Sequence, residues 1–524
     1  MSDLKATRRD FLVCGAAISG GVLLGGCTDR QPLMTDQAGM EPMTMTPEAA
    51  GVAAPSGPAD VTLRIAPVLV DVAKDTTIST YGYNGTVPGP IVRLREGVPI
   101  TVEIINNLDI AELVHWHGQT IPPAVDGAEE ENSLMVPAHG SLRYRMTPGP
   151  SGFRFVHAHM MAGPDLHRGT YTGQFAPVYI EPVQNPGRYD QEVFLATHEW
   201  EPFFTTEEME DMDDVEQPQN QPAAAAEKVS DNDAEPQSAG SLCGSGEVAN
   251  QATGESKPNG WEIGYHLFSI NGKALGFGEP IRVREGQQVL FHILNASATE
   301  NLRLALPGHR FLVVGLDGNP VPQPQLVDVL QLGTAERIDM IVEMNNPGVW
   351  ILGTTRDDDR RDGMGIVVEY ANKSGEPQWQ APPKSRWDYT IFGDDRPVAQ
   401  PDETIPLVFG KINGGKGGFN RWTVNGKAFK HNDPPQKLIK GRRYRFLFDN
   451  RTDDAHPIHL HRNVFELTNV FGKPTGGIMK DVVLVKGFGK VSVDFTPDQP
   501  GLTLFHCHQQ LHMDYGFMKV FNVV

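Results

Sequence analysis

A strand–turn–strand pattern of hydrophobic and polar residues occurs three times along the chain, in residues 91–106, 281–295 and 436–450. After the turn, the residues alternate between the two classes up to an asparagine nine positions beyond the turn glycine, which is Gly97, Gly286 or Gly441. Alternation with a period of two is typical of a strand that buries one face. The pattern therefore predicts three related units built from strands.

A second strand, which begins with a glycine, follows later in each unit, in residues 152–159, 348–355 and 501–508. Five residues after that glycine the first and third copies carry a histidine, whereas the middle copy has Gly353. Repetition of one strand pattern at domain length predicts three all-β sandwich domains, over residues 61–185, 190–372 and 387–524. Chemistry at the histidine positions is then expected from the first and third domains together.

Composition agrees with this organisation and excludes some functions. The chain has 524 residues, and its 55 glycines and 41 prolines favour many short strands over long helices. At roughly 100–200 residues per domain, this length fits three domains. The net charge of -20 argues against a nucleic-acid binder, because few cations are left to neutralise phosphates. Four cysteines are too few for a disulfide-based scaffold.

The N-terminal residues have the composition of an export signal. Residues 7–13 read Thr-Arg-Arg-Asp-Phe-Leu-Val, and the apolar run that follows to Gly26 is too short and glycine-rich for a membrane span. This segment resembles a twin-arginine signal, so residues 1–27 are expected to direct the chain to the periplasm or cell envelope. Leu24-Gly-Gly-Cys27 also resembles a lipobox, which would place a lipid anchor on Cys27.

Two further segments are predicted to be flexible. Residues 28–60 form a leader in which Met40, Met43 and Met45 are either soft copper ligands or part of a disordered tether. Residues about 201–258 predict a disordered acidic insert in the second domain, because the first 35 of them hold 12 acidic side chains against one lysine. The insert is either a solvated loop or an arm that collects cations.

Ten of the 17 histidines fall into four clusters, in residues 115–117, 157–159, 456–461 and 506–512. In a strand, residues i and i+2 point to the same face, so each His-x-His pair presents two imidazoles to one site. Cys507 stands between two of these histidines and projects to the opposite face. Imidazoles with a single thiolate form a copper-type ligand set, unlike the carboxylate-rich sites of Mg²⁺ or Ca²⁺ and unlike structural zinc. The strand around Cys507 is therefore expected to serve two metal sites.

In order and spacing, these four clusters resemble those of the multicopper oxidases, the laccase-like blue copper enzymes. The resemblance implies an all-β fold of three cupredoxin-like Greek-key β-sandwich domains and four copper ions. By position, it implies a type-1 copper on His456, Cys507 and His512, and a type-2 copper on His115 and His459. It implies two type-3 coppers, one on His117, His157 and His508 and the other on His159, His461 and His506.

Further expectations near the copper ligands follow from the resemblance. The axial type-1 position is Phe517, whose ring cannot coordinate copper, so a raised reduction potential is expected. A shift of the strand by one residue would bring in Met518 instead. Asp126 is either the acid that supplies protons at the trinuclear site or a plain turn residue. After the last type-1 histidine, where some relatives carry a glutamate, this chain has Met513.

The expected activity is that of a blue copper oxidase. Single electrons leave a reductant at the type-1 site, pass through Cys507 to His506 and His508, and reduce O2 to water at the trinuclear cluster. A phenol or aromatic amine is the first expected reductant, because a high potential suits such donors; Cu(I) or Mn(II) is the alternative, favoured by the leader and the insert. A copper-free scaffold protein of the same fold is the non-enzymatic alternative. The protein is expected to be a monomer.

Overall fold

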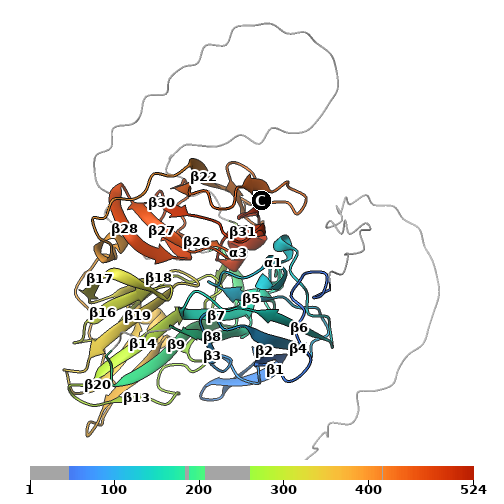
Figure 1. Ribbon diagram of the computed structural model, residues 1–524. Coiled ribbons are helices and arrows are strands. Elements are labelled where there is room, and N and C mark those ends of the chain that lie inside the picture. The colour runs from blue at the N-terminus through green and yellow to red at the C-terminus, as the bar shows by residue number, and fades with distance from the viewer. Residues whose placement is uncertain (1–45, 183–187, 207–259, 416) are drawn as a thin grey trace, which may run out of the picture. The chain divides into compact units, whose positions relative to one another are not determined.

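A computed structural model, drawn in Figure 1, describes residues 46–182, 188–206, 260–415 and 417–524. The predicted export signal, Cys27 and the leader methionines lie outside these residues, as does the acidic insert from residue 207 onwards. Within the described residues, no helix is both long and apolar enough to cross a membrane.

Two four-stranded sheets form the first domain. The first sheet contains, in spatial order, β2 (Thr76–Tyr83), β1 (Val61–Ala73), β4 (Ile100–Asn106) and β6 (Ser141–Met146). The second contains β3 (Val92–Arg95), β8 (Phe175–Glu181), β7 (Gly152–Ala158) and β5 (Val114–His117). The short helical turns of this domain are α1 (Pro123–Asp126) and η1 (Glu129–Glu131), which lie between β5 and β6, and η2 (Gly169–Tyr171), which lies between β7 and β8.

The second domain contains a six-stranded and a five-stranded sheet. The larger has the order β12 (Leu267–Ile270), β9 (Gln191–Trp200), β14 (Gln288–Asn295), β19 (Arg337–Glu343), β16 (Phe311–Leu316) and β17 (Asn319–Val327). The smaller has the order β13 (Ile281–Val283), β21 (Gly365–Tyr370), β20 (Val349–Thr354), β15 (Leu302–Ala305) and β18 (Leu330–Leu332). A separate hairpin pairs β10 (Phe203–Thr205) with β11 (Glu262–Gly264), and the one α-helix of the described part of this domain is α2 (Asp357–Arg361).

The third domain repeats this plan after the 3-10 turn η3 (Tyr389–Phe392). Its six-stranded sheet has the order β23 (Arg421–Val424), β22 (Glu403–Ile412), β25 (Tyr444–Asn450), β30 (Lys490–Phe495), β27 (Phe465–Val470) and β28 (Lys473–Lys480). Its five-stranded sheet has the order β24 (Gln436–Leu438), β32 (Met518–Val523), β31 (Gly501–Cys507), β26 (His456–Leu460) and β29 (Val482–Val485). The helix α3 (Gln510–Asp514) follows β31.

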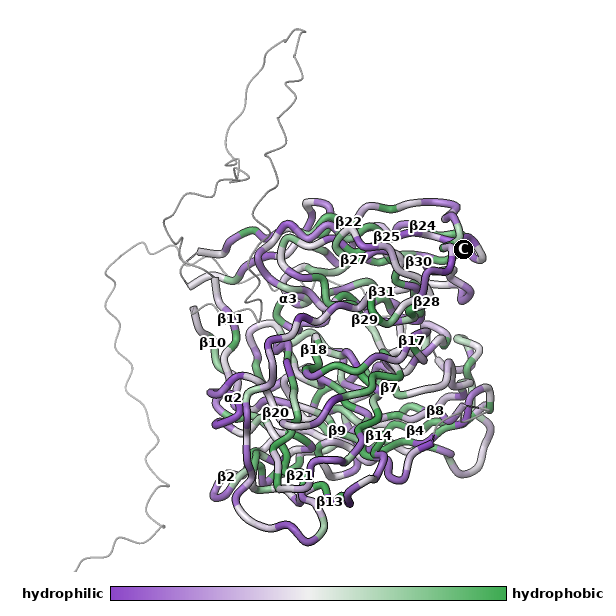
Figure 2. The backbone as a smooth tube through the Cα atoms, turned by 90° about the vertical axis from the view of Figure 1, so that its left-hand side faces the viewer, coloured by the Kyte–Doolittle hydropathy of each residue, from purple (hydrophilic) through white to green (hydrophobic). Residues whose placement is uncertain are grey.

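The second and third domains share one sheet order, and the first four strands of each of their sheets correspond to the two four-stranded sheets of the first domain. The predicted all-β fold of three sandwiches is therefore confirmed. The repeated strand pairs of the sequence are β3–β4, β13–β14 and β24–β25. Burial alternates along strands with one solvent-facing side, as in β1, where Val61 and Leu63 are buried and Thr62 is exposed. Figure 2 shows hydrophobic residues along strands such as β7, β9 and β14 and hydrophilic residues along the outer loops.

The repeated asparagine has the same structural role in each domain. The side chain of Asn106 donates from Nδ2 to the carbonyl of Ile110 (2.8 Å) and accepts the N–H of Leu108 (3.0 Å). Asn295 makes the matching bonds to Glu300 and Ser297, and Asn450 to Asp454 and Thr452. Each asparagine thus fixes the loop that leaves its strand, by satisfying backbone groups that have no sheet partner.

Two segments predicted to be flexible are partly ordered. The leader from residue 46 onwards contacts the first domain: Val52 is buried, and its carbonyl accepts the N–H of Arg145 at 2.8 Å. The predicted insert begins later than residue 201, because Phe203–Thr205 forms β10. In both places an apolar side chain packs against a domain, Val52 in a buried position and Phe204 of β10 in a partly buried one, and composition does not reveal such contacts.

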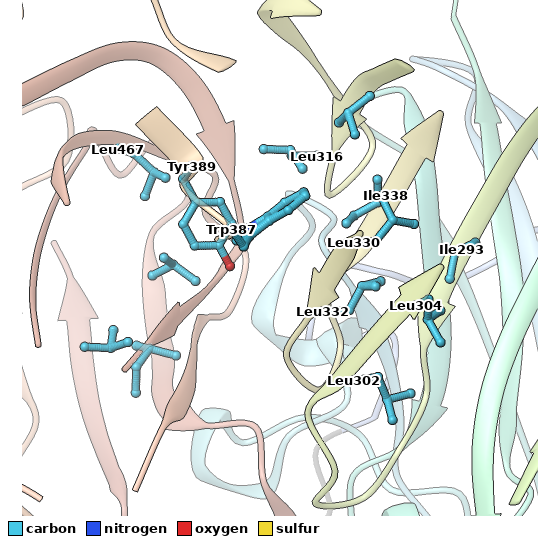
Figure 3. Packing of buried hydrophobic residues seen from close by; sticks show 14 of the residues in the cluster. Ile293, Leu302, Leu304, Leu316, Leu330, Leu332, Ile338, Trp387, Tyr389 and Leu467 are labelled. Carbon is cyan, nitrogen blue, oxygen red and sulfur yellow. The ribbon is translucent and has the colours of Figure 1, made fainter. Parts of the chain in front are cut away.

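The second and third domains share one hydrophobic core across their junction. Trp387 and Tyr389, in the segment that joins the two domains, are both buried. Figure 3 shows their rings between Leu467 of the third domain and Leu316 and Leu330 of the second. The linker's aromatic rings are buried against both domains, and this packing fixes the two domains against each other.

In the second domain, close to the first domain, a buried histidine is paired with carboxylates from two neighbouring strands. His292 donates from Nδ1 to Asp339 at 2.6 Å, and its Nε2 lies 3.4 Å from Glu192. Glu192 is also paired with Arg93 of the first domain. Burial lowers the pKa of His292, but the two carboxylates outweigh it and raise the pKa to about 9. The hydrogen bond from His292 and the contact with Arg93 lower the pKa of Glu192 to about 2.

We expect His292 to stabilise the fold in a pH-dependent way. Because its pKa is about 9 in the folded chain and about 6.5 in an unfolded one, the stabilisation is complete below about pH 6.5 and is lost as the pH rises through 9. It amounts to at most about 3 kcal/mol, or a few degrees in Tm. The Tm difference between wild type and His292→Gln, measured by circular dichroism, should be largest at pH 6 and shrink by pH 9.5. The exposed His139, paired with exposed Asp109, provides the control His139→Gln, whose Tm difference should be small at both pH values. A His292→Gln difference that does not change with pH would contradict the prediction.

Candidate copper centres

Strands β5 and β7 bring the first two histidine clusters together. They pair antiparallel, with His115 directly opposite His157. His117 follows two residues after His115, and His159 lies just beyond the end of β7. Almost every residue of both strands is buried, so the face that carries the imidazoles points into protein.

Strands β26 and β31 arrange the other two clusters in the same way. His459 lies opposite His506, and Ile458 lies opposite Cys507. Since side chains alternate along a strand, Cys507 faces away from its two flanking histidines. The Cys507 sulfur lies 3.7 Å from His456 Nδ1, so one strand contributes to two different groups of ligands, as predicted.

Imidazoles of the first and third domains are interleaved. The ring of His115 stacks on that of His461 with centroids 4.0 Å apart, and the ring of His117 stacks on that of His459 at 3.9 Å. The His508 ring lies 5.1 Å from that of His117. In Figure 1, β5 and α1 of the first domain lie close to β31 and α3 of the third, and α1 contacts β31. The two domains therefore meet at the eight histidines predicted for the trinuclear cluster.

Hydrogen bonds to one ring nitrogen leave the other nitrogen available. Four rings donate one N–H to a backbone carbonyl at 2.7–2.8 Å: His115 to Asp126, His157 to Ala158, His459 to Asp481 and His506 to Cys507. The opposite nitrogens of His115, His157 and His459 are buried without a hydrogen-bond partner in the described chain. A buried polar atom without a partner is unfavourable, and a ring fixed in this way offers its free lone pair to a metal ion.

The rings are also held in the neutral form that binds metal. Burial first, and neighbouring imidazoles after it, lower the pKa well below the usual 6.5 in His117, His159, His461 and His508. A neutral imidazole keeps the lone pair that a cationic one lacks. The nitrogens of His159, His461 and His506 lie close enough together to hold one ion, and these are three ligands predicted for a single type-3 copper.

The thiolate site is a separate, smaller group. The Nδ1 atoms of His456 and His512 lie 3.1 Å apart, and the Cys507 sulfur lies 3.5 Å from the Nδ1 of His512. His456 Nε2 donates to Thr452 Oγ1 at 2.7 Å, which turns its Nδ1 towards the sulfur. Two imidazole nitrogens and one sulfur at these separations fit the His₂Cys set of a blue copper site.

Comparison with known sequences gives the family. Three profiles described as Multicopper oxidase match residues 65–185, 244–371 and 404–524. The chain belongs to the multicopper oxidase family. It is 29% identical over 523 residues to the multicopper oxidase MmcO of Mycobacterium tuberculosis, covering 98% of this chain and 95% of that protein.

Solved structures share the fold of this oxidase. The multicopper oxidase of Campylobacter jejuni, described as a metallo-oxidase, has a TM-score of 0.63 at 17% identity over 90% of this chain and 93% of that one. A laccase-like enzyme of Ochrobactrum sp. has a TM-score of 0.62 at 19% identity over 88% of this chain and 97% of that one, and its described activity is towards lignin model compounds. At these identities the likeness establishes the fold of three cupredoxin domains and no reductant.

The oxidase therefore uses copper and O2, and its donor atoms fit the family's copper sites. The free nitrogens face the trinuclear position, and the His₂Cys group fits type 1. Retention of this ligand set leaves no support for a copper-free scaffold. The assignment of individual histidines to type-2 and type-3 copper stays a prediction, as made from the sequence.

Phe517, the residue predicted for the axial position, lies beside the type-1 ligands. Its ring is fully buried, and its centroid lies 4.8 Å from that of His456. Met518 pairs across the sheet with His506 and packs with Leu504 in a different hydrophobic cluster. The expectation of a non-coordinating phenyl ring at the type-1 site therefore agrees with the strand register.

Asp126 contacts the trinuclear histidines and is more than a turn residue. Its Oδ2 accepts the Nδ1–H of His461 at 2.8 Å and lies 3.2 Å from His115 Nδ1. The carboxyl group is fully buried at the C-terminal end of α1. Asp126 thus connects a predicted type-2 ligand with a predicted type-3 ligand, which is a suitable position for an acid that serves the reaction.

Two buried acids at the trinuclear site were not found from the sequence. Asp481 Oδ1 accepts the Nε2–H of His117 at 3.1 Å. Glu131 Oε1 accepts the N–H of Leu504 at 2.7 Å and lies 3.6 Å from His461 Nδ1. Glu131 ends an acidic run of three that looks like a solvated surface turn, and Asp481 stands alone between a lysine and a valine run. Neither carries a local signal, because only the fold brings them to the histidines.

We expect Phe517→Met to lower the reduction potential of the type-1 site. A thioether in place of the phenyl ring would add an axial donor, and axial ligands tune this potential. The measurement is a redox titration of the blue absorption, with Met518→Leu as the control that should leave the potential unchanged. An unchanged or higher potential in Phe517→Met would show that residue 517 does not occupy the axial position.

Proposed function

We propose that this oxidase removes single electrons from phenols or aromatic amines. The observation that carries the proposal is the apolar axial side of the type-1 site, where Phe517 lies against His456 in the place of a fourth donor. A weak or absent axial ligand favours a high potential. A high potential suits donors that are hard to oxidise, such as phenols and aromatic amines.

The surroundings of His512 support an uncharged aromatic reductant. Trp422 stacks on the His512 ring with centroids 3.9 Å apart, and its Nε1 donates to Asp454 at 3.3 Å. Lys411 Nζ lies 2.9 Å from the same carboxylate and 2.8 Å from Asp453. The ammonium group offsets one of these two negative charges, which weakens their attraction for a metal cation.

The chain provides a direct connection from this site to the trinuclear histidines. Cys507 is bonded through the backbone to His506 and His508, and its carbonyl also accepts the Nδ1–H of His506 at 2.8 Å. Copper ions bound at these sites supply one-electron exchange and O2 reduction, in which four electrons and four protons give two water molecules. Asp126 holds a carboxyl group at His461, where protons are consumed.

Oxidation of Cu(I) or Mn(II) is the second candidate, and one observation favours it. The hairpin β10–β11 flanks the acidic segment 207–259, and Trp261 beside it bridges to Phe419. The side chain of Asn420 donates to Glu262 of β11 at 3.1 Å. Residues 417–420 lead to Trp422, so the hairpin strands that flank the acidic segment in sequence lie close to the type-1 side of the molecule.

Deletion of the acidic segment separates the two candidates. Thr205 and Glu262 are paired neighbours in the hairpin, so a short Gly-Ser linker can replace residues 208–258. We expect kcat/KM for a substituted phenol to stay within about threefold of wild type, because a neutral substrate is not steered by charge.

The rate of metal-ion oxidation, measured by oxygen consumption, tests the second candidate function. Two results together would establish the second candidate. The wild type would oxidise Cu(I) or Mn(II) faster than phenols, and the deletion variant would oxidise these metal ions about tenfold or more slowly while its rate with phenols is unchanged. Cys507→Ser is the control: it should be colourless and inactive with both classes of reductant, since the thiolate ligand is gone.

We also propose that the oxidase acts in the periplasm or cell envelope. The support is the twin-arginine-like segment at residues 7–13, with Cys27 as a site for a lipid anchor. A system that exports folded proteins would allow copper to be loaded before export.

A further inference from the structure

The middle domain carries none of the predicted copper ligands, yet its charged residues reach the trinuclear histidines. Six buried charges from all three domains form one group, here called the junction network: Arg154, Asp317, Glu336, Arg337, Lys480 and Asp481. Each side chain is 0–1% exposed. Three positive and three negative groups balance, which is the condition for burying charges together.

Asp481 is the member that contacts the histidines. Its Oδ1 accepts the Nε2–H of His117 at 3.1 Å, and its backbone carbonyl accepts the Nδ1–H of His459 at 2.7 Å. The other nitrogens, His117 Nδ1 and His459 Nε2, are buried without hydrogen-bond partners. One residue thus determines which nitrogen two predicted copper ligands present to the cluster.

Arg337 of the middle domain fixes the side chain of Asp481. Its Nη1 and Nη2 donate to the two carboxylate oxygens, each at 2.6 Å, in a bidentate pair. Arg154 of the first domain adds one bond to Oδ2 at 3.0 Å. A planar guanidinium that binds both oxygens sets the orientation of a carboxylate, which a single ammonium group cannot do.

The middle domain fixes the backbone of Asp481 as well. Asp317 Oδ2 accepts the N–H groups of Asp481 and Val482, at 3.2 Å and 3.1 Å. Asp317 Oδ1 accepts the N–H of Arg337 at 3.0 Å, so the two middle-domain residues hold each other. The peptide that presents its carbonyl to His459 is therefore anchored from the same side as the carboxylate.

The space around this pair is fitted closely to it. Gly118 follows the ligand His117 with a φ of +77°, and a Cβ there would lie 2.5 Å from Asp481 Oδ2 and 2.9 Å from Arg337 Nη2. The Arg337 guanidinium also lies 5.8 Å from the centroid of the Phe155 ring, which stacks on His117 at 4.4 Å. Two routes, one ionic and one aromatic, thus lead from Arg337 to the same imidazole.

We propose that Arg337 is a positioning residue of the trinuclear centre: through Asp481 it orients His117 and His459, so the ligand-free middle domain helps to determine copper binding. The proposal does not depend on which reductant the oxidase uses. It assigns Arg337 no contact with substrate. Its effect is confined to the trinuclear side because, among the residues that the structure describes, the side chains of the type-1 ligands make no hydrogen bond or ion pair with the network.

The test compares Arg337→Met and Arg337→Lys with Arg360→Met in the full-length, copper-loaded oxidase. Arg360 is the matched control: it lies in the same domain, donates to the Thr354 carbonyl at 2.7 Å and stacks on Trp379, far in sequence from the ligands. We expect Arg337→Met to keep the blue type-1 absorption but to lose type-2 EPR intensity, type-3 near-ultraviolet absorption and bound copper. Removal of an outer ligand partner of this kind lowers metal affinity by about 10–100-fold. Arg337→Lys should lie between Arg337→Met and wild type, and Arg360→Met should keep all signals.

Asp481→Asn tests whether Arg337 acts through the carboxylate. We expect Asp481→Asn to give the same selective loss of the trinuclear signals. The double variant Arg337→Lys/Asp481→Asn should lose little more of these signals than Asp481→Asn alone, since the effects of substitutions within one network are not additive. Unchanged trinuclear signals in Arg337→Met, or in Arg337→Lys if the methionine variant does not fold, would overturn the proposal. A parallel loss of type-1 and trinuclear signals in the Arg337 variants would also overturn it, because it would show a general role in stability.

Discussion

Eight imidazole rings packed together inside the protein are the constraint on which the rest of the structure depends. A buried ring nitrogen without a partner is unfavourable, so each ring needs a bond on one side and a metal ion on the other. Backbone carbonyls accept the first kind of bond from four of the eight rings, and for His157 and His506 the carbonyl belongs to the next residue. In these four rings the backbone fixes both the position of the ligand and the nitrogen that it presents.

The cluster also explains why the first and third sandwich domains alone are not enough to form the trinuclear site. The histidines come from the first and third domains, and their rings stack across the junction. Without the middle domain, this junction would bury Arg154, Lys480 and Asp481, which are two positive charges and one negative charge. Asp317, Glu336 and Arg337 of the middle domain bring the total to zero, and the shared core around Trp387 holds that domain in place.

The type-1 side is organised by different forces. Phe517 and Trp422 surround His456 and His512 with aromatic surface, and burial raises the pKa of the Cys507 thiol. A bound metal ion opposes that shift, because a coordinated thiol is deprotonated. The site thus combines an apolar environment with one soft ligand, while the trinuclear side combines neutral rings with buried acids. The two environments lie on opposite faces of β31.

The sequence by itself determined the repeats, the sandwich class and the chemistry of the ligands. These properties depend on local rules: alternation reveals strands, and His-x-His spacing places two rings on one face. Its choice of Phe517 over Met518 for the axial position also rests on a local property, the strand register, and agrees with the contact between Phe517 and His456. Only the tertiary structure decided the contacts of Asp126, and it alone revealed Asp481, Glu131 and the junction network. Their partners lie more than 100 residues away, and a lone acidic residue in a sequence looks the same whether it meets solvent or a buried arginine.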